Sequence, residues 1–145
     1  MARILEAVIL GAPLAEAIAT VEKNVKGDLK SLPSEVQAQV MQALVQGKQA
    51  GTEENRMLCN ILLEVGRSCA LPGSFIGPIA IFYKYASMPN TFVPAVRENI
   101  VASDDTCSRS MFIGAVLEAA GVKKNHNSND SIPEDWIDKM DEETL

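Results

Sequence analysis

The chain has 145 residues, of which 47% are hydrophobic and 5% aromatic, and it carries a formal net charge of −6 at pH 7. This length suits a single domain, residues 1–145, with one core of small and aliphatic side chains, as in closely packed helices. The basic residues form no stripe, which argues against nucleic acid or an anionic membrane as a partner. Residues 134–145 hold six acids against Lys139, so the end of the chain, 141–145, is expected to be a solubilising acidic tail.

Cysteine usage and the N-terminal sequence both favour an intracellular protein. Cys59, Cys69 and Cys107 are odd in number and lack the CxxC spacing of a metal site, which argues against a disulfide framework and against a zinc site. We therefore expect a reducing, cytoplasmic compartment. The start MARILEAVILGAPL resembles a weak signal peptide, but its apolar spacing continues as an amphipathic helix, and we interpret it as folded structure.

The first half of the chain predicts amphipathic helices. Apolar residues recur at helical spacing, and each series is bordered by residues that start or stop helices. Pro13 suits a first turn and Gly27 a stop, while Gly47 is expected to end the second helix. Thr52, followed by two glutamates, is expected to open the third. The three series are Leu14, Ile18, Val21 and Val25; Val36, Val40 and Leu44; and Leu58, Ile61, Leu62, Val65 and Cys69.

The second half predicts further helices separated by short links. In the link ALPGSF, Pro72 disfavours a helical residue before it and Gly73 permits a tight turn. Ser74 and Phe75 in this link form either one wall of a ligand site or part of a plain turn. Residues 123–132 have the composition of a flexible, solvated loop. The helical series are Ile79, Phe82, Tyr83 and Ala86; Phe92, Val96 and Ile100; and, after Pro133, Trp136, Ile137 and Met140.

No stretch has the period-two pattern of a strand, so the sequence predicts an all-α fold of seven or eight helices. The stretch SDDTCSRSMFIGAVLEAAG contains a polar loop, Ser103 to Ser108, followed by a helix that ends at Gly121. This helix is apolar nearly all round and is expected to lie inside the molecule. Its loop can direct the oxygens of Asp105 and Ser108 to one point, as a hard cation requires. Alternatively, Asp105 or Thr106 only caps the helix.

The pattern Asp-Thr-x-Ser, the apolar helix after it, and Ile-Pro-Glu-x-Trp at 132–136 are similar to the C-terminal portion of the ADP-ribosylglycohydrolase family. The similarity extends from ARILEAVILG through LPGSF to IPEDW. It implies a compact orthogonal helical bundle, the C-terminal part of a longer fold whose members use magnesium to cleave ADP-ribose from an acceptor. It also implies Asp105 and Ser108 as metal ligands, magnesium as the cofactor, and ADP-ribose or an ADP-ribosylated protein as the partner.

Three departures from the family pattern bear on activity. Cys107 replaces the second acid of the family's loop, and its soft sulfur is a poorer magnesium ligand than a carboxylate. Ser103 and Asp104 replace paired glycines and tolerate a positive φ less well. The family's N-terminal half, which supplies further acidic motifs and the water-activating carboxylate, has no counterpart. We therefore expect an exposed apolar face whose partner is that missing half or a second copy of the chain.

The loop Asp-x-Cys-Ser-Arg at 105–109 resembles the branch that contains the J1 crystallins of jellyfish lenses and selenoprotein J. The helix dipole and Arg109 favour a thiolate at Cys107, whereas Asp104 and Asp105 oppose it, so a reactive thiol and an inert one both stay open. The resemblance implies an ADP-ribosylglycohydrolase-like protein that is inactive as this chain alone. The alternative is a catalytically silent structural protein, such as a J1-type lens crystallin.

Overall fold

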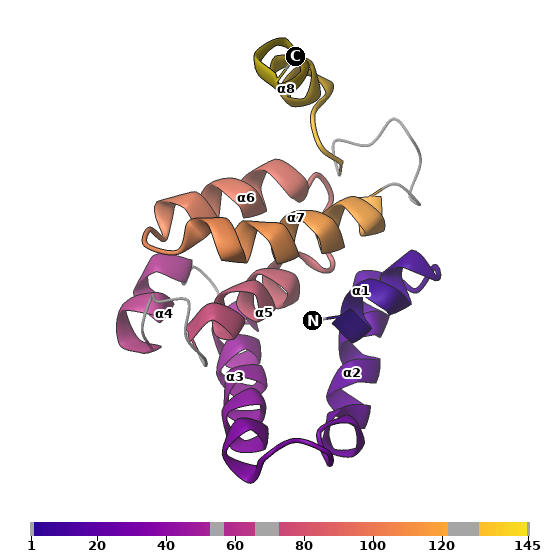
Figure 1. The fold of residues 1–145 in the computed structure, drawn as a ribbon, viewed down its shortest axis with the longest axis vertical. Helices are drawn as coiled ribbons and strands as arrows, with labels where there is room; N and C mark the ends of the chain where they lie inside the picture. Colours follow the sequence, from indigo (N-terminus) through magenta and orange to yellow (C-terminus); the bar gives the residue numbers. More distant parts are fainter. Residues whose placement is uncertain (1, 53–56, 66–72, 122–130, 145) are drawn as a thin grey trace.

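The structure is a computed structural model that describes residues 2–52, 57–65, 73–121 and 131–144. These residues form eight α-helices and no strand, which confirms the predicted all-α class and number of helices. None of the described helices is both long and apolar enough to span a membrane. The helices are α1 (Ala2–Ile9), α2 (Leu14–Asp28), α3 (Ser34–Thr52), α4 (Leu58–Val65), α5 (Gly73–Tyr85), α6 (Phe92–Val101), α7 (Thr106–Gly121) and α8 (Glu134–Thr144) (Figure 1).

The central helix is α5, around which most of the other helices pack. Every residue from Ile76 to Phe82 is buried, so α5 has no exposed side in its middle. It packs most extensively on α3 and also contacts α2, α4, α6 and α7. Figure 1 shows α6 and α7 side by side across one end of α5, and α1 and α2 form a pair that contacts α7 and α5.

Helix α7 is only half-buried, which corrects the expectation that it lies inside the molecule. Its buried residues face α1, α5 and α6. On the opposite side, Met111 and Phe112 are 65% and 44% exposed, and Cys107 and Ala115 are exposed as well. We call these four residues the outer face of α7. Apolar composition predicted burial on all sides, but the described helices cover only one side.

Helices α3 and α5 approach each other closely at a glycine. Gly47 does not end a helix, as the sequence predicted, but lies buried in the middle of α3. A Cβ at this position would come within 2.8 Å of the Cβ of Ile79 in α5. Thr52 is the last residue of α3 instead of opening a new helix, and its hydroxyl donates to the carbonyl of Lys48 at 2.9 Å. On the α3 side, small residues therefore form this contact. The predicted apolar residues Val36 and Val40 are only half-buried.

The N-terminal segment folds into two helices that are separated by Gly11. This glycine has a φ of 110°, a backbone conformation that favours glycine over other residues. Its N–H donates to the carbonyl of Val8, and the N–H of Ala12 donates to the carbonyl of Ala7, both at 3.0 Å. This pair of hydrogen bonds is a Schellman motif, which ends α1 and turns the chain toward Pro13 and α2.

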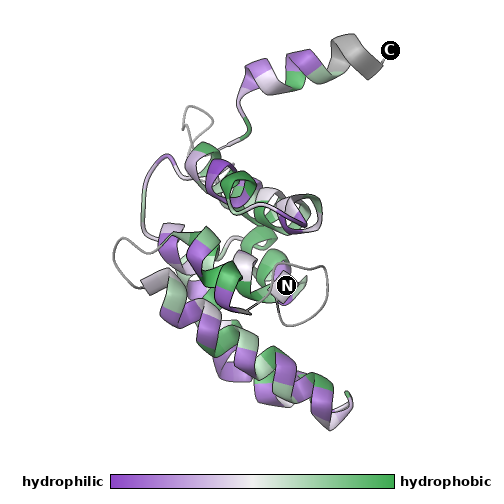
Figure 2. Ribbon diagram, turned by 90° about the vertical axis from the view of Figure 1, so that its left-hand side faces the viewer, coloured by the Kyte–Doolittle hydropathy of each residue, from purple (hydrophilic) through white to green (hydrophobic). Residues whose placement is uncertain are grey.

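Helix α8 lies apart from the other helices in Figures 1 and 2. The ring of Trp136 in α8 meets that of Phe92 at a centroid distance of 6.3 Å, and just before the helix the N–H of Ile132 donates to Glu118 at 2.6 Å. Residues 141–144 belong to α8, so the predicted tail is helical up to residue 144. Of the predicted flexible loop, residues 123–130 lie outside the described residues, as do Cys69, Pro72 and residue 145 of the predicted tail.

Candidate functional site

The candidate site is the short connection between α6 and α7. Ala102 to Asp105 join the helices, and Thr106 to Ser108 already form the first turn of α7, so the loop is shorter than predicted. Ser103 and Asp104 have φ angles of 66° and 60°. These left-handed conformations are unfavourable for residues with a Cβ, although Asp tolerates them better than most. Ser103 and Asp104 thus adopt the backbone that glycine favours.

Asp105 and Ser108 are in direct contact. The Ser108 hydroxyl donates to Oδ1 of Asp105 at 2.9 Å, and the Ser108 N–H lies 3.4 Å from the same oxygen. This is the geometry of a helix cap at the start of α7. The other oxygen, Oδ2, is buried and has no hydrogen-bond partner among the described residues. The capping and ligand interpretations of Asp105 are therefore compatible, because each uses a different oxygen.

The donor set at this loop does not fit a resident magnesium ion. Magnesium prefers a near-octahedral shell of oxygens, of which proteins usually supply one or two carboxylates. Here Asp105 offers one carboxylate oxygen that no described residue contacts by a hydrogen bond, and the hydrogen of the Ser108 hydroxyl is already directed at Asp105. Within the described ranges, no group of three His, Cys, Asp or Glu side chains comes together. We derive no chemical step through a bound metal.

Cys107 lies on the outer face of α7 as an exposed free thiol. Arg109, by contrast, is fully buried, and its guanidinium bonds to Asn99 and to the carbonyl of Ser103. The arginine was expected to stabilise a thiolate at Cys107, but it points into the core while the thiol points outward. A reactive role for Cys107 stays a prediction that rests on the helix start alone.

A buried polar network underlies the loop. Arg109 donates from Nε to Oδ1 of Asn99 at 2.8 Å and from Nη2 to the carbonyl of Ser103 at 2.6 Å. The Asn99 amide donates to the carbonyl of Thr106 at 3.0 Å and to the Ser110 hydroxyl at 2.8 Å. Both Arg109 and Asn99 are completely buried. Hydrogen bonds of this kind fix the loop from inside, and satisfied buried polar groups tend to define one conformation.

Gly77 in α5 provides the space for the Arg109 side chain. A Cβ on Gly77 would lie 2.8 Å from Cδ of Arg109, well inside van der Waals contact. The arginine therefore crosses α5 at a point where that helix has no side chain. Apolar periodicity does not predict this network, although Asn99 on an otherwise apolar face and Arg109 in an apolar helix are signals of it in the sequence.

A second polar cluster surrounds Glu98 on the other side of α6. Its carboxylate accepts hydrogen bonds from Lys84 at 2.8 and 2.9 Å, from the Tyr85 hydroxyl at 2.7 Å and from the Leu58 N–H at 3.0 Å. Burial acts to raise the pKa of Glu98, but these hydrogen bonds and the Lys84 charge lower it below the usual value. Burial, and then the bond to Glu98, raise the pKa of Tyr85. These bonds join α4, α5 and α6, and none of them reaches the loop at Asp105.

Ser74 and Phe75 lie in the first turn of α5 and not in a link between helices. Both are half-buried. The predicted plain turn is wrong at these positions because the helix begins at Gly73. A ligand-binding role for the two residues stays a prediction.

No protein-family model, no curated protein and no solved structure matches the chain. The functional interpretation therefore depends on the loop between α6 and α7 and on the sequence pattern around it.

Proposed function

We propose that this chain is an ADP-ribosylglycohydrolase-like protein that corresponds to the C-terminal part of that fold and is inactive as a hydrolase on its own. ADP-ribose, free or attached to a protein, is its proposed ligand, and the cytoplasm its proposed location. The observation that carries the proposal is the loop before α7. One carboxylate oxygen of Asp105 is buried without a partner among the described residues, and the backbone at Ser103 and Asp104 has the left-handed form.

The proposed lack of activity follows from what the loop cannot supply. Metal-assisted hydrolysis needs cations that orient the substrate and a base that activates water. Cys107 stands at the position of the family's second acid, and its thiol is exposed. A single carboxylate and a hydroxyl leave magnesium with most of its water shell, so we propose weak magnesium binding at most.

The alternative function is a catalytically silent structural protein such as a J1-type lens crystallin. The hydrogen bond that Ser108 donates to Asp105 favours this alternative, because a helix cap is all that a purely structural loop requires. The two proposals differ in whether ADP-ribose is bound at Asp105.

Two measurements on the purified chain test these proposals. The first follows release of ADP-ribose from serine-linked and arginine-linked substrates at high magnesium, where we expect no turnover. Turnover that disappears in Asp105→Ala would refute the proposed inactivity. The second is thermal stabilisation by ADP-ribose, which we expect in the unmodified chain and not in Asp105→Ala. Equal stabilisation of both proteins, or none, would favour the structural alternative. Ser34→Ala, at an exposed position of α3, is the matched control.

A further inference from the structure

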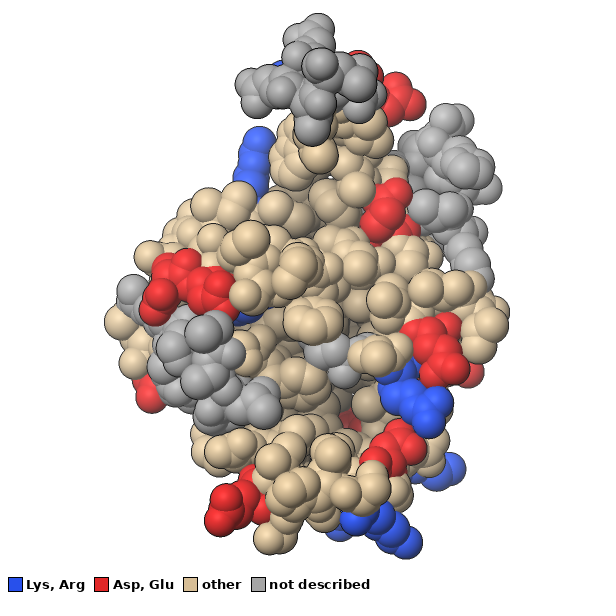
Figure 3. All heavy atoms as spheres, in the orientation of Figure 1, with Lys and Arg blue, Asp and Glu red and all other residues tan. Residues whose placement is uncertain are grey.

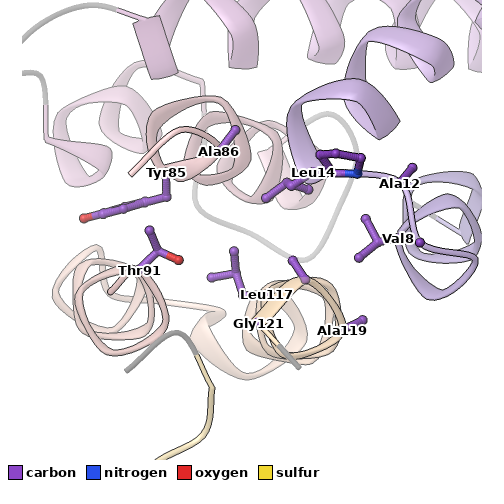
Figure 4. A pocket seen from close by; sticks show the side chains of 12 residues that line it. Val8, Ala12, Leu14, Tyr85, Ala86, Thr91, Leu117, Ala119 and Gly121 are labelled. Atoms are coloured by element: carbon purple, nitrogen blue, oxygen red, sulfur yellow. The ribbon is translucent and has the colours of Figure 1, made fainter. Parts of the chain in front are cut away.

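A pocket of about 200 Å³ lies where four parts of the chain meet. The turn between α1 and α2 forms one wall, and the end of α5, the start of α6 and the end of α7 form the others (Figure 4). It is at the opposite end of α7 from Asp105, about 20 Å away along the helix axis at 1.5 Å per residue. The pocket is therefore separate from the site discussed above.

Small side chains leave this space open. Ala12, Ala86, Ala119 and Ala120 line it together with glycines, so no long side chain reaches across. Figure 4 shows larger apolar side chains, among them those of Leu14 and Leu117, around the same space. The pocket is partly open to solvent and is not an enclosed void.

The walls of the pocket are uncharged. No Asp, Glu, Lys, Arg or His is among the described residues that line it. The one phenol, Tyr85, donates its hydroxyl to Glu98, so the ring and not the hydroxyl is presented to a ligand. A charged ligand would lose part of its hydration here without gaining a charged partner among the described residues, so its affinity should be lower.

We propose that this pocket binds a compact, uncharged, apolar molecule of one or two rings. The pocket's volume of about 200 Å³ exceeds that of an engineered apolar cavity of about 150 Å³ that takes up benzene in another protein, so the pocket has room for a slightly larger molecule. Indole is a suitable probe, because it is flat, apolar and neutral. Its carboxylate derivative indole-3-acetate tests the preference for an uncharged ligand.

The test is a titration of the full chain with each probe, followed by methyl NMR of Val8, Leu14 and Leu117. We expect saturable shifts of these methyl groups with indole and affinity about tenfold or more weaker for indole-3-acetate, because its charge is desolvated without a partner. Filling the pocket with Ala120→Leu or Ala86→Leu should abolish the shifts. Ala38→Leu, at an exposed position of α3, should leave them unchanged.

Several outcomes would overturn the proposal. Unchanged binding of indole to both filled variants would place the probe elsewhere, as would shifts confined to Met111 and Met140 on exposed surfaces. Equal affinity for the two probes would contradict the uncharged class of ligand. Circular dichroism shows whether each variant is folded, and either of the two filled variants is sufficient for the test. The result is independent of Asp105, so it stands or falls separately from the proposed function.

Discussion

The two carboxylate oxygens of Asp105 have different environments, and this difference decides how the residue can be used. Oδ1 holds the first turn of α7 through Ser108, whereas Oδ2 is buried without a partner among the described residues. A buried acceptor without a partner costs about 1–3 kcal/mol, so a cation or a donor at this point would recover free energy. Cys107, two residues on in the first turn of α7, is the position at which the proposed family match places a second acid.

Cys107→Asp should therefore strengthen magnesium binding. The substitution adds a carboxylate in the first turn of α7, so calorimetry should show about tenfold or greater tightening over a weak or undetectable starting affinity. Met111→Asp, which adds the same charge one turn further along the outer face, should give no comparable gain. Tight binding by the unmodified chain, or no difference between the two variants, would contradict the proposed ligand geometry.

Glu98 predicts a specific dependence of stability on pH. Its pKa in the folded protein is lowered, so ionised Glu98 stabilises the fold above the unfolded value of about 4.3, and this stabilisation is lost as the pH falls through the folded-state pKa. Glu98→Gln should lower the free energy of unfolding by about 1–2 kcal/mol at neutral pH, because hydrogen bonds to a charged group are lost. The difference from the unmodified chain should shrink below about pH 4.

Urea unfolding at several pH values measures this effect. Glu35→Gln, at an exposed position of α3, is the control and should change stability little at any pH. A cost of Glu98→Gln that stays constant down to acidic pH would show that the carboxylate acts through shape and not through its charge.

At the scale of the element, the sequence predicted the existence of helices better than their ends and their buried sides. The spacing of Leu14, Ile18 and Val25 predicted α2 correctly, and all three are buried. In α6 the predicted series included Ile100, which is 57% exposed, while the buried side carries Asn99. Apolar spacing cannot show which side of a helix its neighbours cover. Asn99 is polar but buried, because its hydrogen-bond partners lie outside its own helix.

Close packing of α3 on α5 makes Gly47 a sensitive position. Gly47→Ala should destabilise the protein by about 1–3 kcal/mol, because the added methyl group pushes Ile79 and the backbone of α5 away from α3. Gly114→Ala in α7 is the matched control, since a Cβ there meets nothing within 4 Å. The control should gain up to about 1 kcal/mol from helix propensity. Thermal unfolding that ranks the two variants in the opposite order would contradict the packing described here.

At the scale of the whole molecule, the exposed apolar side chains include those of two elements near the end of the chain. The outer face of α7 is one, and α8 is the other, with Ile137 and Met140 exposed by 47% and 68%. Figure 3 shows uncharged surface over the middle of α7. Neighbouring exposed apolar side chains, such as those of the outer face of α7, commonly mark a protein interface.

The chain should therefore bind a hydrophobic dye while folded and associate at high concentration. Replacing Met111 and Phe112 together by Lys should reduce both effects, because the charges interrupt the outer face of α7. Val45→Lys, at a residue that is 60% exposed on α3, should leave them unchanged. Dye fluorescence and light scattering measure the two effects. A strictly monomeric unmodified chain that binds no dye would rule out an open apolar face.

The candidate site was predictable only where its residues are close in sequence. Asp105 and Ser108 are three residues apart at a helix start, so their contact follows from local geometry. The contacts of Glu98 with Leu58 and Lys84 join residues that are 40 and 14 positions apart in the sequence. Contacts at such separations produce no periodic pattern in the sequence. The same holds for the support of the loop by Arg109, which depends on a glycine in another helix.

The fit between Gly77 and Arg109 limits how this protein can evolve. A larger residue at 77 is tolerated only after the arginine has been shortened, and a shortened arginine leaves Asn99 and the carbonyl of Ser103 without a donor. Each change alone is therefore harmful, and only an ordered set of changes leads to another stable sequence. In descendants of this chain, positions 77, 99 and 109 should be replaced together or kept together, even where the residues on the surface of the loop diverge.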